Sequence, residues 1–270
     1  MSSVAISRAW RVGRISPLAE LLSPGRITAT VARLVLQTTL VVCLWDALYA
    51  HTTVNSGLTR QQAVDYAVLA VLVTRTRGTD RQSNRDGVNW HVYGGTIVYW
   101  FLRPVSPRRY YLYKSLGEQA YDLLWAAFGY GVGWLAGIIS GPASAGSALF
   151  FLTTLLLGQV IYYELTLTTD LMCFWTVQNS AVLTVLRFAQ NLLSGAYAPL
   201  WYFPGWFIAM STVLPFAATL NVPLSLYTGR LAPGQAAGQL AIQAAWAAGL
   251  CLGNQLLWRR AALRVSSQGG

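Results

Sequence analysis

The segment from Leu193 to Gly229, called the broken segment below, constrains the fold more than any other part of the chain. It is almost uncharged and long enough to cross a bilayer, yet it is interrupted at Pro199, Pro204, Pro215, Pro223, Gly195 and Gly205. Each proline inside a helix removes a backbone donor and clashes with the preceding turn, so one continuous transmembrane helix is excluded. Non-helical backbone at membrane depth persists only where protein or a water-filled cavity satisfies the freed backbone groups.

The broken segment is therefore predicted to end one transmembrane helix and to fold back as short helices at the membrane surface. Its aromatic residues are of the kind that favour a membrane interface. We expect an extracellular gate made of Tyr197, Pro199, Trp201, Tyr202, Phe203, Pro204, Trp206 and Phe207. A gated path of this kind indicates transport.

The composition places the chain in a membrane. Of its 270 residues, 54% are hydrophobic and only 10% are charged, whereas an ordinary soluble domain is about 25% charged. The formal net charge of +10 does not indicate nucleic-acid binding, because the arginines are confined to gaps between apolar stretches. Cys43, Cys173 and Cys251 lie at no metal spacing, so neither a disulfide framework nor a metal site is expected. No removable signal peptide is predicted, because no apolar core with a small-residue cleavage site directly follows the N-terminal arginines.

Apolar runs predict an all-α, polytopic membrane protein with about six transmembrane helices and a single transmembrane domain, residues 1–270. The expected crossings are 31–50, 62–74, 119–139, 147–168, 179–199 and 235–258. Residues 1–30 mix arginines with apolar side chains, which suits an interfacial helix on the membrane surface. Residues 75–118 form a polar and aromatic section, and residues 200–234 hold the expected re-entrant helices between the fifth and sixth crossings.

Positive charges predict the orientation. The N-terminal arm, the section 75–118 and the C-terminal tail hold nearly all the lysines and arginines, and the other side holds only Arg60 and Arg230. With six crossings these three regions fall on one side, which the positive-inside rule makes cytoplasmic. Both termini are thus expected in the cytoplasm, with the protein in the cell inner (cytoplasmic) membrane.

The end of the cytoplasmic section, residues 94–118, predicts a short amphipathic helix that Pro104 ends. Such a helix can dock into a soluble partner, or it can rest on anionic lipid with its arginines near the head groups. The residues expected to make this contact are Ile97, Val98, Phe101, Leu102, Arg103, Pro104, Arg108 and Arg109.

Two motifs resemble one known family. One is a short helix followed by LRPVSP, which spans Leu102 to Pro107, and the other is LSGAYAPLWYFPGW…LPFAATLNVPLSLYTGRL, which spans Leu193 to Leu231. Both are similar to motifs of the type-2 ABC exporter permeases, and in particular of their antibiotic- and multidrug-associated branch of small, six-helix permeases. The resemblance covers roughly residues 10 to 260.

That resemblance implies a permease subunit that exports an apolar or amphipathic substrate and is not itself an enzyme. Separate ABC ATPase subunits, which bind ATP and Mg, would drive it, while this chain would bind no cofactor. A second permease, expected to be a paralogue in a heterodimer, would complete the path. The loop between the second and third crossings would carry the coupling helix. The sequence agrees in lacking a G-x-x-x-x-G-K-[ST] loop, and it departs from the family at residues 75–89, which are more arginine-rich than expected.

Four charged residues fall in or near the expected crossings: Asp46, Asp65, Glu164 and Arg187. Charges inside a membrane are costly, so each is a functional candidate. Arg187 lies deepest and could form a structural pair with Glu164, or the charges could form a substrate or proton site.

The proton-site reading gives the alternative function, an ion-coupled secondary transporter. Such transporters favour internal repeats with matched broken helices in both halves, whereas here only the second half has a clear broken segment. A membrane-embedded enzyme has no support, because His51 and His91 lie far apart and no nucleophile–base or metal constellation occurs.

Overall fold

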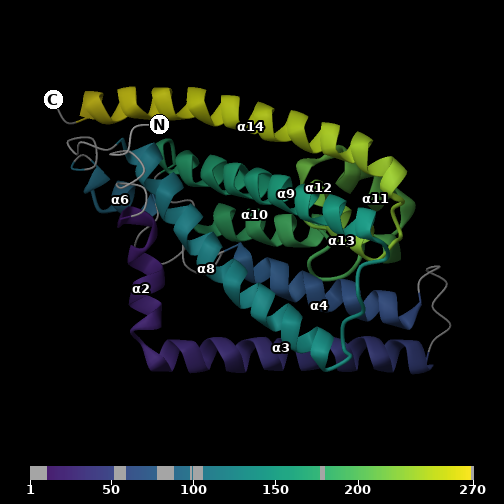
Figure 1. The fold of residues 1–270 in the computed structure, drawn as a ribbon. Coiled ribbons are helices and arrows are strands. Elements are labelled where there is room, and N and C mark those ends of the chain that lie inside the picture. The colour runs from purple at the N-terminus through teal and green to yellow at the C-terminus, as the bar shows by residue number, and fades with distance from the viewer. Residues whose placement is uncertain are drawn as a thin grey trace.

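The computed structural model describes residues 11–51, 59–77, 88–97, 99, 106–176 and 180–268, and this part of the chain is helical without a strand. The elements are α2 (Ile15–Leu21), α3 (Pro24–His51), α4 (Arg60–Thr76), α6 (Val88–Tyr93), α8 (Pro107–Leu135), α9 (Ala145–Leu171), η1 (Met172–Phe174), α10 (Ser180–Leu193), η2 (Leu200–Tyr202), α11 (Gly205–Val213), α12 (Pro215–Thr219), α13 (Asn221–Tyr227) and α14 (Pro233–Gln268). The long helices form an elongated bundle, and α2, α6 and the end of α14 lie at the same end of it (Figure 1).

The all-α prediction is confirmed, and a helix stands at each of the six expected crossings: α3, α4, α8, α9, α10 and α14. Within the described ranges, three helical stretches are long and apolar enough to cross a membrane, namely Pro24–Ala50, Ala145–Phe174 and Pro233–Leu263. The other three are shorter or more polar, so the number of six crossings stays a prediction.

Several helix boundaries differ from the predicted ones for local reasons. Helix α10 ends at Leu193, six residues before Pro199, because Gly195 turns the chain with a φ of +79°, a conformation that glycine adopts at little cost. Helix α8 begins at Pro107, a residue suited to the first turn because its missing donor is not needed there. The second part of the expected cytoplasmic section therefore forms the first three turns of α8.

The N-terminal arm is only partly separate from the first long helix. Helix α3 already begins at Pro24, so the end of the 1–30 arm belongs to it. Helix α2 runs at a steep angle to α3 (Figure 1), as a helix lying along a membrane surface would. The arm approaches α8 closely where Gly13 meets Gly117, since a Cβ on Gly117 would overlap the Gly13 backbone.

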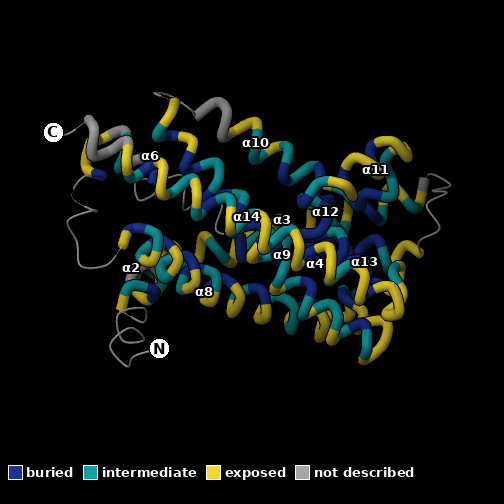
Figure 2. Tube along the Cα trace, turned by 90° about the horizontal axis from the view of Figure 1, so that it is seen from above, coloured by how far each residue is buried: buried dark blue, intermediate teal, exposed yellow. Residues whose placement is uncertain are grey.

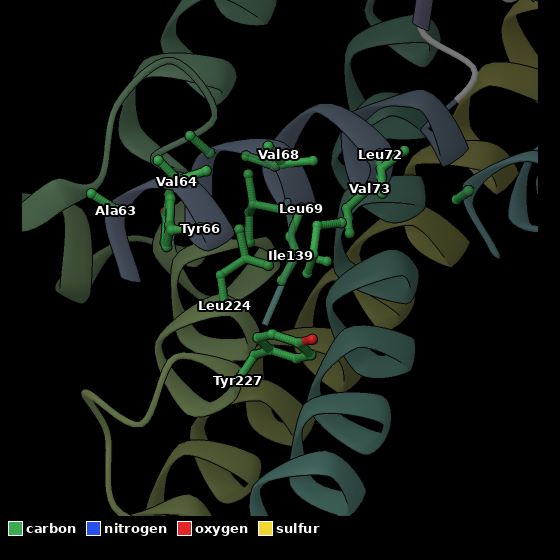
Figure 3. Close-up of a cluster of buried hydrophobic side chains, with 14 of the residues drawn as sticks. Ala63, Val64, Tyr66, Val68, Leu69, Leu72, Val73, Ile139, Leu224 and Tyr227 are labelled. Carbon is green, nitrogen blue, oxygen red and sulfur yellow. The ribbon is translucent and has the colours of Figure 1, made fainter. Parts of the chain in front are cut away.

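Helix α4 is the centre of the bundle. A capping box between Thr59 and Gln62 starts it, and all residues from Ala63 to Ala70 are buried. Its side chains meet Ile139, which follows α8, and Leu224 and Tyr227 of α13 (Figure 3). Exposed residues lie on the outer faces of the surrounding helices (Figure 2). A helix predicted only as a short apolar run thus becomes the core on which the broken segment packs.

Candidate functional site

The broken segment consists of four short helices, η2, α11, α12 and α13, none long enough to span a bilayer, which takes about 20 residues. Pro204 immediately precedes α11, and Pro215 begins α12 at its first turn. Pro223 falls within the first turn of α13. Pro199 likewise immediately precedes η2, so all four prolines of the broken segment lie at the start of a helix rather than inside one.

The end of α12 reaches deep into the bundle. Gly158, the fourteenth of the 27 residues of α9, approaches the backbone of Thr219 so closely that a Cβ there would lie 2.7 Å from the Thr219 carbonyl oxygen. From α14, the Gln243 amide donates to the carbonyl oxygens of Ala218, at 2.6 Å, and Thr154, at 3.1 Å. A buried side-chain amide thus satisfies a carbonyl oxygen at the end of α12 and ties it to α9, which is how non-helical backbone inside a membrane is tolerated.

The predicted gate aromatics contact helix α3 and one another. The Tyr202 hydroxyl lies 2.8 Å from that of Tyr49, and the Tyr202 ring lies 5.0 Å from that of Trp45. The rings of Phe203 and Phe207 stack at 4.6 Å. These contacts join α3 to η2 and η2 to α11.

The remaining predicted gate residues divide into buried and exposed ones. Pro199 is buried, and Trp201 is half-buried with its ring edge-on to Tyr66 and beneath the guanidinium of Arg230. Pro204, Tyr197 and Trp206 are exposed, and the two aromatic side chains are 58% and 69% exposed. The structure therefore brings only part of the predicted set together.

Tyr66 of α4 connects the beginning of the broken segment to its end. Its hydroxyl lies 3.1 Å from the carbonyl oxygen of Gly195 and 3.2 Å from the side-chain oxygen of Asn221. Gly195 also needs to be glycine here, because a Cβ would lie 2.5 Å from the Tyr66 hydroxyl oxygen. Tyr66 was not predicted as a site residue, since its only signal is that it is a tyrosine inside an apolar run.

We expect Tyr66→Phe to lower the free energy of unfolding by about 1–3 kcal/mol, because buried acceptors on Gly195 and Asn221 lose their donor. The measurement is thermal unfolding of the purified chain in lipid nanodiscs. Tyr99→Phe is the matched control, since Tyr99 is 66% exposed and should change stability little. Equal stability of the two variants would contradict the connecting role of Tyr66.

Arg77, which directly follows α4, binds the last residue of α12, Thr219. Its Nη2 donates to the Thr219 carbonyl at 2.8 Å and to the Thr219 hydroxyl at 3.0 Å. Its guanidinium also lies over the Tyr162 ring of α9, 4.6 Å from the centroid. Arg77 is only 3% exposed, and its Nε and Nη1 have no hydrogen-bond partner within the described part of the chain. One buried cation thus joins α4, α9 and α12.

The four intramembrane charges all interact with other residues. Asp46 pairs with Arg60 at 2.8 Å on the exposed side of α3 and α4. Buried Asp65 accepts from the Gln61 amide and from the backbone of Ser140, which fixes the turn after α8.

Each of the two deeper charges has an identified partner. The carboxylate of Glu164 accepts from Asn254 of α14 at 2.7 Å, whereas Arg187 interacts electrostatically with Asp170 at the end of α9. These contacts hold helices together, which favours the structural reading of the charges.

The predicted coupling residues are only partly placed. Val98, Phe101, Leu102, Arg103 and Pro104 lie outside the described residues. Ile97 is buried within the chain, Arg109 is exposed on α8, and Arg108 lies near the Cys251 thiol, 3.7 Å away. Helix α6 packs through Val88 on a cluster with Tyr111 and Cys173, so part of this section rests on the ends of α8 and α9.

A cavity of about 670 Å³ lies between α8 and α9, with α4 at its back. Its lining is mostly aliphatic, and buried Leu69, Leu72 and Val73 form its floor. Leu116 and Leu123 of α8 and Leu156 of α9 form its rims and are half or more exposed. The cavity is therefore a groove that opens to the outside of the bundle.

A protein-family model described as "ABC-2 family transporter protein" matches residues 34–269. The chain belongs to the ABC-2 family. The comparisons with curated proteins and with solved structures found no match. The family match covers both α4 and the broken segment and confirms the resemblance to type-2 ABC permeases. It also identifies the chain as a membrane component of a transporter, in agreement with the missing phosphate-binding loop.

Several residues that organise this ABC-2 permease were not predicted as site residues: Trp45, Tyr66, Arg77, Gly158 and Gln243. Gln243 carried a usable signal, because an amide in the middle of a membrane-spanning run is expected to bond across helices. Gly158 carried a weaker one, since small residues mark close helix contacts. The partner in both contacts is the backbone of α12, which no sequence pattern indicates.

Proposed function

We propose that this chain is the transmembrane permease subunit of an ATP-driven ABC exporter that moves an apolar or amphipathic substrate outward. The observation that carries the proposal is the end of α12 buried at the midpoint of α9, together with the family match. Short helices held at that depth by single side chains can move without unfolding a spanning helix. The ring contacts of Tyr202 with Trp45 and of Phe203 with Phe207 give such a gate a mostly apolar surface.

The proposed exporter needs partners for its energy and its path. ABC ATPase subunits would bind ATP and Mg and contact the section 75–118, with Phe101 and Leu102 as apolar anchors. A second permease, proposed to be a paralogue, would face this one. Both termini would lie in the cytoplasm, and the broken segment would enter the bundle from the outside, in agreement with the charge distribution.

The alternative, an ion-coupled secondary transporter, would use Asp46, Asp65, Glu164 and Arg187. The contacts in the structure favour the exporter, because each of these charges interacts with a residue that fixes a helix or a turn. A charge that binds and releases an ion would need to exchange such contacts in every cycle.

We expect the full chain, purified in mild detergent, to bring with it a soluble ATPase and a second permease. Reconstituted in vesicles, this complex should transport only when ATP and Mg are supplied on the ATPase side. Vesicles containing the chain alone are the control and should be inactive. Transport by the chain alone, driven by an ion gradient and independent of ATP, would contradict the exporter and support the alternative.

A further inference from the structure

One face of α3 carries two arginines followed by a row of leucines. Arg26 and Arg33 are seven residues apart, which places them on the same side of the helix, and both are exposed. Leu36, Leu40 and Leu44 continue this side at helical spacing, and each is more than half exposed. This surface is called the Arg26–Leu44 face below.

The Arg26–Leu44 face is turned away from the bundle. The side of α3 that packs on α4 carries Leu34 and Trp45, which belong to the buried core. Arg33 precedes Leu34 by one residue, so its side chain is rotated from that packed side by about 100°. Because α3 is long and apolar enough to cross a membrane, the exposed leucines of the face are expected to lie in lipid hydrocarbon.

The depth of Arg33 in the bilayer requires an anion near it. Asp46, further along α3, forms an exposed ion pair with Arg60 at 2.8 Å, which suits the outer membrane surface. Arg33 is 13 positions from Asp46, or about 20 Å at 1.5 Å per residue, whereas the hydrocarbon is about 30 Å thick. The Arg33 backbone therefore lies inside the other boundary, and its side chain leans back toward the start of α3. A cation at this depth draws lipid head groups toward it.

The space between the two arginines suits a phosphate group. Ala29 lies between Arg26 and Arg33 and is exposed, so no large side chain fills the gap. Thr30 beside it is half-buried, and its hydroxyl accepts from Arg75 of α4 at 3.2 Å. Guanidinium groups bind phosphate oxygens through charge-assisted hydrogen bonds that are frequently bidentate. Two of them on one exposed face therefore form a phosphate-binding surface.

The local charge favours a lipid of net negative charge. Residues 11–50 contain four arginines and only two acidic residues, Glu20 and Asp46, and Asp46 is paired at the far end of α3. From the neighbouring helices, Arg75 lies 3.7 Å from Asp122, so this pair adds no net charge. Each arginine near a membrane surface attracts anionic lipid, whereas the cationic group of a zwitterionic lipid offsets the attraction of its phosphate.

We propose that the Arg26–Leu44 face binds a phospholipid of net negative charge, with its phosphate between Arg26 and Arg33 and an acyl chain along the leucines. A lipid suits this face better than an acidic protein surface, because Arg33 lies within the thickness of the bilayer and the leucines continue directly from it. That the lipid belongs to the cytoplasmic leaflet rests on the orientation in the proposed function.

The test is photolabelling of the full chain in phosphatidylcholine nanodiscs with a phosphatidylglycerol that carries a diazirine on its acyl chain. Peptide mass spectrometry should place the label on α3 between Ala29 and Leu44. Unlabelled phosphatidylglycerol should compete at about tenfold lower mole fraction than phosphatidylethanolamine, whose net charge is zero. Equal competition by the two lipids would overturn the proposal, and so would competition by millimolar inorganic phosphate, which has no acyl chain.

Three double variants separate the arginine pair from general charge attraction. Arg26→Gln with Arg33→Gln should reduce labelling of α3 about tenfold, whereas lysine at both positions keeps the charge and should stay within about threefold of the unmodified chain. Arg259→Gln with Arg260→Gln is the matched control. These arginines are also exposed, at the same end of the bundle on α14 (Figure 1), and their loss should leave α3 labelling unchanged. Equal loss in both glutamine pairs would contradict a site on α3.

The labelling needs neither ATP nor transport, so it can fail independently of the proposed function. If bound ATPase subunits blocked the labelling, the face would belong to a protein contact and the lipid site would be overturned. No preference for phosphatidylglycerol in a chain whose complex exports with ATP would remove only the lipid site. A preference retained by a chain that transports without ATP would keep the site and remove the exporter.

Discussion

Gly158→Leu should prevent the broken segment from reaching its place in the bundle. A Cβ on Gly158 would lie 2.7 Å from the Thr219 carbonyl oxygen and 3.2 Å from that of Ala218. Both neighbours are backbone atoms, which no rotamer change can move aside, and Gln243 holds Ala218 from the other side. Overpacking a well-packed core costs about 1–3 kcal/mol and occasionally more, and we expect Gly158→Leu to exceed that range. Thermal unfolding in nanodiscs measures the loss.

Gly249→Leu is the matched control. Gly249 is exposed on the long helix α14, and a Cβ there meets nothing within 4 Å. Leucine should even favour that helix by a few tenths of a kcal/mol up to about 1 kcal/mol. The same substitution is thus expected to lower the free energy of unfolding on α9 and to raise it slightly on α14. A stable Gly158→Leu variant that behaves like Gly249→Leu would show that α12 does not lie against α9.

The approximate positions of the helices could be predicted from the sequence, because apolar runs and prolines determine helix formation through neighbouring residues alone. Pro107 and Pro215 lie at the first turns of their helices, where a missing donor costs nothing. The end of α10 was predicted at Pro199 and was wrong by six residues. The turn comes instead at Gly195, where the left-handed backbone and the close approach of Tyr66 coincide. A glycine signals that a turn is possible, but only the distant tyrosine decides that it occurs there.

The contacts that hold the broken segment could be predicted only in part. The gate aromatics were identified from composition, yet their partners Trp45 and Tyr49 lie about 150 residues earlier in the chain. The pairing suggested for Glu164 and Arg187 was reasonable by depth. The Glu164 carboxylate accepts from Asn254, an uncharged residue that was not considered as its partner. In a membrane, polar partners are chosen by helix rotation and packing, which a single sequence does not reveal.

Arg77 links the section 75–118 to the end of α12, so its replacement is expected to affect both stability and transport. It follows α4 directly and begins the stretch that leads to the proposed coupling residues. Any displacement of that stretch would therefore reach Thr219 through two hydrogen bonds from one Nη2. A buried charge is costly to retain, and a role in transmitting motion would explain its presence.

We expect Arg77→Met and Arg77→Lys to separate stability from transport. Methionine removes the cost of a buried charge but also leaves the buried Thr219 carbonyl without its donor, which costs about 1–3 kcal/mol, so the two effects oppose each other and the net change in stability should be small. Lysine keeps the charge but lacks the planar fork that bonds Thr219 and stacks on Tyr162, so it should destabilise the chain by about 3 kcal/mol. Both variants should lose ATP-driven export at least about tenfold, since neither holds α12 to α4.

Arg60→Met is the control. It removes an exposed pair with Asp46, and it should change stability by less than about 1 kcal/mol and keep export. Full export by the methionine variant would assign Arg77 a purely structural role.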